Sequence, residues 1–270
     1  MTITETVDHF ARYAQTKAAM LSRAPLGFAI SAMKAGAYVG LGIILIFSVG
    51  QEADPSFRAL VMGASFGIAL TLVVFAGSDL FTGHAMYGAH AWLTGRLGVG
   101  AVLANWAGSW GGNLAGALLV AALFVIGGGG VVLQAGGADL LHAVAAKKMH
   151  GGALELVARG MLCNWLVCLA IWTAARTRDD AAKCILIFWC LFAFIAAGFE
   201  HSVANMTVFS VALMSEHGAG IDLAGAVHNL FWVTLGNLIS GVVIMGAGYW
   251  IVGGCPRDGL PEQAALRGPG

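Results

Sequence analysis

The sequence predicts an all-α integral membrane protein with six membrane-spanning helices. Its composition is the first reason, because 59% of the 270 residues are hydrophobic, only 10% are charged, and the mean hydropathy is +0.81. So few charges cannot cover an ordinary soluble core with a polar surface. The second reason is a series of apolar runs close to the roughly 20 residues that cross a hydrocarbon layer. The third is the 39 glycines, since small residues let helices pack closely in lipid.

The elements follow in order along the chain. Residues 1–24 have apolar positions at three- and four-residue spacing, which predicts an amphipathic cytoplasmic helix lying on the membrane surface. The six spans of a channel domain, residues 25–252, are expected at about 27–49, 59–78, 101–127, 153–175, 183–198 and 222–252. Residues 253–270, with several Pro and Gly residues, are expected to form a disordered cytoplasmic tail. The distribution of Lys and Arg predicts that both termini lie in the cytoplasm.

Polar clusters interrupt the second and fifth spans. They read GSDLFTGH (77–84) and GFEHSVAN (198–205), and we call them the first and second breaks. Each continues into an apolar piece of about 10 residues, too short to cross a membrane alone. A G-N-L motif follows each break, with Asn113 34 residues after Asp79 and Asn237 37 residues after Glu200. This predicts two three-span repeats, about 25–127 and 153–252, with the second inverted so that the breaks face each other at the midplane.

Two kinds of polar residue occupy the breaks. Asp79, Glu200 and Asn205 are expected to satisfy backbone groups that the breaks leave without helical partners. His201 is different, because an imidazole at the centre of a bilayer is a poor helix cap and a good proton carrier. The spacing predicts that His201 and Thr82 of the opposite break share a hydrogen bond.

Bulky apolar residues and two further polar residues surround the breaks. The apolar ones are Phe66, Phe194, Leu80 and Phe81. They fit either ordinary core packing or a narrow pore with two dry constrictions. Lys148, just before the fourth span on the non-cytoplasmic side, is either a solvated loop residue or a group that draws anions to a pore mouth. Asn164 lies inside an apolar span and needs a polar partner in a pore or between helices.

The sequence resembles the formate/nitrite transporter family. The motifs that carry the resemblance are AGSDLFTGH, GFEHSVANM, CNWLVCLAIW and HNLFWVTLGN. The likeness covers almost the whole chain, and His84 after Thr82-Gly83 is most similar to the nitrite branch. The resemblance implies an aquaporin-like fold and a homopentamer with one pore per protomer. It also implies a non-enzymatic transporter for nitrite assimilation in the bacterial cytoplasmic (inner) membrane, with no cofactor and no metal.

The resemblance also implies a role for each residue near the breaks. His201 is expected to be the central pore histidine, with Thr82 as its partner on the first-break loop. Lys148 and Asn164 are expected to be polar residues of the outer pore. The implied periplasmic constriction is Phe66 and Phe194, and the implied cytoplasmic constriction is Leu80, Phe81 and Val167.

The cost of moving an anion through a dry constriction leads to a mechanistic hypothesis. A bare anion faces a Born penalty that can reach tens of kcal/mol, which neutralisation removes. His201 with Thr82 is therefore expected to hydrogen-bond nitrite and to lend or relay a proton. The expected partners are nitrite or possibly formate, protons, the lipid bilayer and other copies of the chain. A net charge of zero offers no basic face for nucleic acid.

Alternatives of other classes stay open at this point. Formate is the alternative substrate within the same family. A pore for a neutral molecule such as water, glycerol or ammonia needs no Lys148. A membrane metalloenzyme using His84, His90 and His201 is a third reading, although no H-x-x-x-H or Cys/His cluster supports it.

Overall fold

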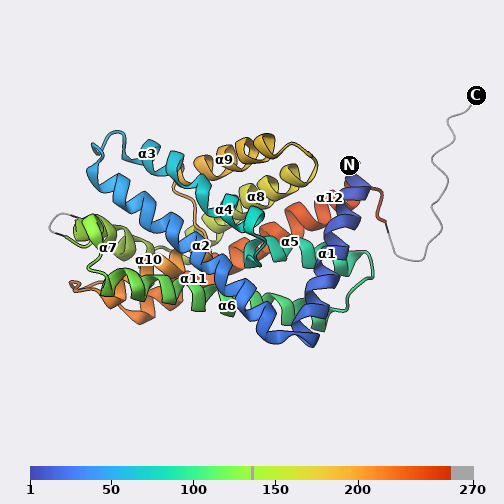
Figure 1. The fold of residues 1–270 in the computed structure, drawn as a ribbon, viewed down its shortest axis with the longest axis horizontal. Helices are drawn as coiled ribbons and strands as arrows, with labels where there is room; N and C mark the ends of the chain where they lie inside the picture. The colour runs from blue at the N-terminus through green and yellow to red at the C-terminus, as the bar shows by residue number, and fades with distance from the viewer. Residues whose placement is uncertain (135–136, 257–270) are drawn as a thin grey trace, which may run out of the picture.

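The computed structural model describes residues 1–134 and 137–256, and every regular element in those residues is helical (Figure 1). The first half comprises α1 (Ile3–Arg23), α2 (Pro25–Glu52), α3 (Arg58–Ser65), α4 (Gly67–Ala76), α5 (Phe81–Leu93), α6 (Val99–Ile126) and the short 3-10 helix η1 (Gly130–Val132). The second half comprises α7 (Gly137–Met149), α8 (Ala153–Ala175), α9 (Asp180–Ala196), α10 (Ser202–Met214), α11 (Leu223–Ile239), the π-helix η2 (Ser240–Ala247) and α12 (Gly248–Val252). Most of the predicted tail, from residue 257 onward, lies outside the described residues.

Five helical stretches of the described residues are long and apolar enough to cross a membrane. They are Pro25–Glu52, Arg58–Ala76, Val99–Ile126, Ala153–Ala175 and Leu223–Val252. They coincide with the first, second, third, fourth and sixth predicted spans, and the all-α class is confirmed. The remaining predicted span, 183–198, corresponds to α9, whose 17 residues fall short of the roughly 20 that a span needs.

Glycines in the left-handed conformation terminate both interrupted helices. Gly77 follows α4 with a φ of +71°, and Gly198 follows the end of α9 with a φ of +72°. A β-carbon disfavours this region, so glycine suits both positions. The chain is then extended at Leu80 and at His201, directly before α5 and α10 begin. Each break is therefore a left-handed turn followed by an extended segment and a new helix.

Close backbone contacts join the long helices of each half. α2 packs along α6, and α8 packs along α11. A β-carbon on Gly116 of α6 would lie 1.9 Å from the carbonyl oxygen of Met33 on α2. One on Gly236 of α11 would lie 2.3 Å from the carbonyl oxygen of Val157 on α8. Only glycine permits such an approach, as in other helix pairs that pack through small residues.

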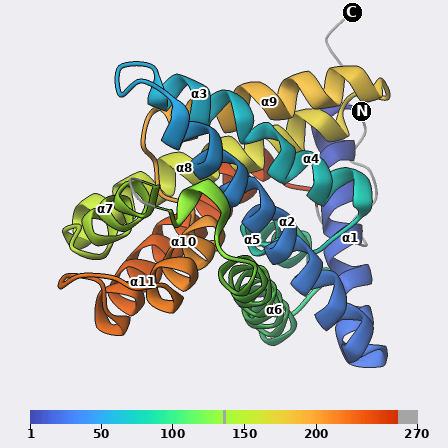
Figure 2. The same ribbon diagram turned by 60° about the vertical axis from the view of Figure 1, so that its left-hand side comes forward.

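The N-terminal helix α1 packs on the protein itself. A capping box of Thr2 and Glu5 closes its first turn. Its apolar residues Val7, Phe10 and Ala14 are at most 4% exposed and lie chiefly against α5. The face that the sequence predicts to lie on the membrane surface is therefore covered by protein. α1 and α7 lie at opposite ends of the molecule (Figures 1 and 2).

Candidate functional site

His201 links the second break to α10. Its Nδ1 accepts a hydrogen bond from the backbone N–H of Ala204 at 3.0 Å, which makes the imidazole the N-cap of the helix. Its ring stacks on Phe194 with 5.9 Å between the ring centroids. The expectation that this imidazole does not cap a helix is therefore wrong. Because Nδ1 accepts, a neutral ring carries its hydrogen on Nε2.

Thr82 connects the two breaks. Its Oγ1 lies 3.1 Å from His201 Nε2, so the imidazole N–H donates to the hydroxyl oxygen. This is the hydrogen bond that the spacing of the breaks predicts. The Thr82 carbonyl oxygen accepts from Asn164 Nδ2 at 3.2 Å, and the same amide donates to the Asn237 carbonyl oxygen at 2.7 Å. Asn164 lies on α8 and is fully buried, and this hydrogen bond supports the Thr82 backbone.

The five predicted constriction residues are all buried, with at most 4% exposure. Phe66 lies at the junction of α3 and α4 and meets Phe194 edge to face, with 5.5 Å between the ring centroids. Leu80 and Phe81 lie at the start of α5, and Val167 lies on α8. The structure thus brings the two phenylalanines of the predicted periplasmic constriction into contact.

Two cavities reach the breaks from different parts of the molecule. The larger, about 460 Å³, is lined by residues of α1, α4 and α8 and by Leu80. The smaller, about 170 Å³, is lined by residues of α2, α7 and α10, including Lys148 and His201. Because α1 and α7 lie at opposite ends (Figures 1 and 2), the cavities approach the breaks from opposite ends. The hydrogen bond between Thr82 and His201 joins the segments that the two cavities reach.

An ion pair and two amides occupy the second break. Glu200 Oε2 accepts from Lys148 Nζ at 2.9 Å and from Asn205 Nδ2 at 2.6 Å. Asn205 Nδ2 also lies 2.8 Å from Asn229 Oδ1, and Asn229 Nδ2 donates to the Lys148 carbonyl oxygen at 2.8 Å. Lys148 lies on α7 with its side chain 20% exposed, so it is a paired residue and not a solvated loop lysine. We call these four residues the Glu200 cluster.

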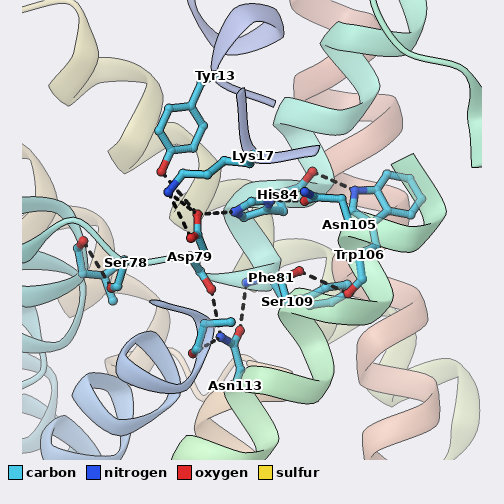
Figure 3. A network of polar contacts seen from close by, with 12 residues as sticks. Tyr13, Lys17, Ser78, Asp79, Phe81, His84, Asn105, Trp106, Ser109 and Asn113 are labelled. Atoms are coloured by element: carbon cyan, nitrogen blue, oxygen red, sulfur yellow. Dashed lines mark hydrogen bonds and ion pairs between the residues drawn. The ribbon is translucent and has the colours of Figure 1, made fainter. Parts of the chain in front are cut away.

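The first break carries a matching cluster (Figure 3). Lys17 Nζ of α1 lies 3.0 Å from both carboxylate oxygens of Asp79. The Tyr13 hydroxyl donates to Asp79 Oδ1 at 3.4 Å, and burial together with the Asp79 charge raises the pKa of Tyr13, so this hydroxyl keeps its proton. His84 Nε2 lies 3.0 Å from Asp79 Oδ1, and its Nδ1 contacts Asn105 Oδ1. We call these five residues the Asp79 cluster.

Asn113 of α6 satisfies the backbone of the first break (Figure 3). Its Oδ1 accepts from the backbone N–H of Phe81 at 2.9 Å. Its Nδ2 donates to the carbonyl oxygens of Asp79 at 2.9 Å and Ala32 at 2.8 Å. One side chain therefore ties the break to α6 and α2.

Asn237 of α11 does the same for the second break. Its Oδ1 accepts from the backbone N–H of Ser202 at 3.0 Å. Its Nδ2 donates to the carbonyl oxygens of Glu200 at 3.1 Å and Gly160 at 2.8 Å. The G-N-L motifs, which the sequence marks only as signs of a repeat, thus carry the residues that hold the breaks.

The predicted partners of the two carboxylates are wrong. Among the described residues, Asp79 and Glu200 use their carboxylates for lysine and for side-chain donors, and not for the freed backbone amides. An asparagine suits the backbone better, because it offers both an acceptor and donors, whereas a carboxylate only accepts. A buried carboxylate needs a cation, which Lys17 and Lys148 supply. The sequence does not reveal Lys17 in this role, because no local pattern shows that α1 reaches the first break.

The three histidines of the metalloenzyme reading lie in different surroundings. His84 contacts Asp79 and Asn105, whereas His201 contacts Thr82 and Ala204. His90 is fully buried beside the rings of Phe10 and Trp172. The described residues hold no group of three or more His, Cys, Asp or Glu side chains placed for a metal ion.

Long apolar helices around two broken segments, with a cavity at each end, define a membrane protein of the channel and transporter class. Comparison with known proteins identifies the family. The family model described as Formate/nitrite transporter matches residues 4–251, and the chain belongs to this family. The resemblance seen in the motifs is confirmed.

Individual relatives and solved structures agree with this assignment. The chain is 49% identical over 266 residues to the nitrite transporter NirC of Salmonella typhimurium, covering 98% of this chain and 97% of the relative. It is 51% identical over 247 residues to the nitrite transporter NirC of Escherichia coli K12, covering 92% and 91%. A solved structure described as an FNT family ion channel has a TM-score of 0.89 at 51% identity, covering 92% of this chain and 99% of that one. A pentameric formate channel with formate bound has a TM-score of 0.75 at 26% identity, covering 85% and 98%.

Proposed function

We propose that this protein is a channel that carries nitrite across a membrane through one pore in each protomer. Relatives named as nitrite transporters share about half of its residues over nearly the whole chain. The observation that carries the proposal is the 3.1 Å contact between Thr82 and His201, which joins the two breaks where the cavities approach them. This contact places an uncharged donor and acceptor at the narrow middle of the pathway.

The apolar residues around this contact favour passage of the neutral acid. Phe66 and Phe194 form the periplasmic constriction, and Leu80, Phe81 and Val167 form the cytoplasmic one. A bare anion between such side chains carries a Born cost that can reach tens of kcal/mol. Nitrite is the anion of a weak acid and is neutralised only while it passes the constrictions, so the net transport still carries charge, whereas nitrate and chloride, as anions of strong acids, cross poorly.

The helix cap of His201 determines what its imidazole does. The neutral ring donates from Nε2 while Nδ1 keeps the N–H of Ala204. A second proton on Nδ1 would face that N–H and remove the cap, at a cost of about 1 kcal/mol. We therefore assign hydrogen bonding of the permeant species to the resting ring.

Lys148 lies at the entrance of the pathway on the α7 side. It lies beside the cavity that reaches His201 and is partly exposed, so it attracts anions to the mouth of this cavity. Glu200 and Asn205 hold it in place. The pair stays neutral overall, which limits how tightly an anion is retained.

We also propose the finer architecture. The α1 helix, within residues 1–24, precedes a channel domain of residues 25–252, in which α9 is the fifth of six membrane spans because the bilayer thins locally around a short helix. The halves at about 25–127 and 153–252 form an inverted, aquaporin-like repeat, supported by matching clusters whose lysines come from α1 and α7, the helices at opposite ends of the molecule. Five copies assemble, as in the relative described as a pentameric formate channel. The assembly lies in the bacterial inner membrane with both termini in the cytoplasm.

Formate is the second candidate substrate. It is also a small monovalent anion of a weak acid, and a formate channel with formate bound shares the fold. The neutral pathway described above does not distinguish the two acids by charge.

The test is a solid-supported-membrane recording with the purified protein in liposomes. Nitrite, formate and nitrate are applied in turn at two pH values. We expect nitrite currents that grow as the pH falls, and little current from nitrate. His201→Ala should lower the nitrite current about tenfold, the equivalent of one lost hydrogen bond to a charged group. His217→Ala, at an exposed histidine, is the matched control. Equal currents from nitrate and nitrite, or an unchanged current and pH dependence in His201→Ala, would contradict the proposal.

A further inference from the structure

The Asp79 cluster holds two titratable groups that the Glu200 cluster lacks, Tyr13 and His84. Because the Tyr13 hydroxyl keeps its proton, His84 is the difference that can change the charge. The fifth residue after the carboxylate is a histidine in the first break and an asparagine in the second. Each contacts its carboxylate and an asparagine of the following long helix. The two sets are Asp79, His84 and Asn105 in the first half, and Glu200, Asn205 and Asn229 in the second. The carboxylate side chain is one methylene shorter where the longer histidine stands, so both sets span a similar gap.

Both ring nitrogens of His84 face oxygen atoms (Figure 3). Nε2 lies 3.0 Å from Asp79 Oδ1, and Nδ1 contacts Asn105 Oδ1. Asn205 makes its two equivalent contacts with N–H donors. A carboxylate oxygen and an amide oxygen only accept, so an imidazole that fills the same place with two donors carries two protons.

Asn105 also allows the neutral form of His84. Its Nδ2 is buried and has no hydrogen-bond partner in the described residues. If the amide turns over, Nδ2 donates to His84 Nδ1 and the ring needs only the proton on Nε2. The matching amide in the second half is held in one orientation, because Asn229 Nδ2 donates to the Lys148 carbonyl oxygen. The first break therefore accommodates both protonation states of its histidine.

The groups that face His84 come from four helices and from the break itself. They are Tyr13 of α1, Phe28 of α2, Asp79 of the break, Tyr87 of α5, and Asn105 and Trp106 of α6, and Lys17 of α1 pairs with Asp79. Of these residues, Lys17 and Asp79 are charged. With His84 neutral these two charges cancel, as Lys148 and Glu200 do in the second break. With His84 protonated, the Asp79 cluster holds one net positive charge.

We propose that His84 is a positioning residue that gives the first break a proton-dependent positive charge, and that this charge tightens the binding of small monovalent anions from the first-break side. The cavity of about 460 Å³ is lined by Tyr13, which belongs to the Asp79 cluster, and by Ser78, the residue before Asp79. The charge therefore acts on an anion in this cavity without touching it. The second break has no titratable group at the equivalent position. This proposal rests on the proposed anion transport.

The first test needs no transport. The full-length protein, labelled with ¹⁵N in its histidines, is studied by NMR in lipid nanodiscs between about pH 5 and about pH 8. The signals of His84 are assigned by their loss in His84→Asn. At low pH we expect nitrogen signals that show both ring nitrogens of His84 protonated. As the pH rises, these should change to the signals of a neutral ring, in which one nitrogen is protonated. A ring that keeps one protonation state over this range overturns the proposal.

The second test uses the chain's own second break as the control design. Asp79→Glu combined with His84→Asn rebuilds the Glu200 cluster in the first break, and His84→Asn alone is the fallback if the double variant does not fold. The half-saturating nitrite concentration is measured in oriented liposomes from each side. As the pH rises, we expect the half-saturating nitrite concentration measured from the first-break side to increase in both proteins. The increase should be about tenfold larger in the wild type than in the variant. This is the size expected for one unit charge acting over about 10 Å at an effective dielectric constant of about 20.

The control and the contradicting outcomes are distinct. The weak-acid equilibrium of nitrite is the same for both proteins, so it cancels in the comparison. From the second-break side, wild type and variant should show the same pH dependence. Equal pH dependence from the first-break side would overturn the role of His84. Absence of any nitrite current in the wild type would instead contradict the proposed function, while the NMR result stands separately.

Discussion

The two breaks have the same backbone support and different proton chemistry. In each, one asparagine from a long helix binds three backbone groups, and one lysine pairs with the carboxylate. The first break places Leu80 after its carboxylate and His84 five residues after it. The second places His201 directly after and Asn205 five residues after. The groups that hold the chain are therefore the same in both halves, and the residues that stand directly after the carboxylate and five positions after it differ. The match also includes α1 and α7, which the predicted repeat halves omit.

The largest effect is expected from the asparagines that hold the breaks. Asn113→Ala and Asn237→Ala each leave two buried backbone groups of a break without their asparagine partner and remove a further hydrogen bond to a helix carbonyl. Each change should lower the stability of the folded protein by about 3–6 kcal/mol. Thermal unfolding of the purified variants measures this. Leu118→Ala, on an exposed face of α6, is the control. A large loss for only one of the two asparagines would break the equivalence of the two supports.

The lysines should reveal the difference between the breaks. Lys148→Met leaves Glu200 with the amide of Asn205 as its remaining side-chain partner, whereas Lys17→Met leaves Asp79 with His84 and the Tyr13 hydroxyl. We expect a loss of about 2–4 kcal/mol for Lys148→Met, because it leaves a nearly unpaired buried charge. The loss for Lys17→Met should be about half as large at low pH, where His84 can replace the cation. Chemical unfolding at two pH values measures both. Equal losses at low pH would show that His84 does not compensate.

The glycine contacts test whether the two halves pack equally. Gly116→Ala and Gly236→Ala force the paired helices apart, since a β-carbon would lie 1.9 Å and 2.3 Å from carbonyl oxygens. Each should cost about 1–3 kcal/mol of stability. Gly111→Ala is the matched control, because no atom of another helix lies within 4 Å of its added β-carbon. Thermal stability of the three variants gives the comparison, and a loss in Gly111→Ala equal to the other two would contradict it.

The smallest effect concerns a contact between the halves. Trp110 Nε1 on α6 donates to Thr234 Oγ1 on α11 at 3.2 Å. Trp110→Phe should remove about 0.6 kcal/mol, the typical value for a hydrogen bond between membrane helices. Thr234→Val should cost a similar amount, and the double variant little more. Additive losses in this double-mutant cycle would show that the two side chains do not interact.

The predictable parts of the molecule are those that depend on local sequence. A glycine followed by polar residues inside an apolar run is visible directly, so both breaks and five of the spans follow from the sequence. The cation of the first break does not, because the reach of Lys17 depends on α1 packing against α5. The cap made by His201 was missed for another reason. The depth of His201 in the membrane favours a role in proton transfer. However, the break also leaves the backbone N–H of Ala204 without a helical partner, and the imidazole accepts from it.

The hydrogen bond between Thr82 and His201 also has a consequence for biosynthesis. Its two residues are 119 positions apart, and they belong to different halves. Lys17 precedes Asp79 and Lys148 precedes Glu200, so each carboxylate emerges from the ribosome when its lysine already exists. The first half can therefore complete its own ion pair early, as domains generally form in order from the N-terminus. The contact between the two breaks cannot form until the second half has been synthesised, so a chain that ends after the first half lacks the hydrogen bond that joins them.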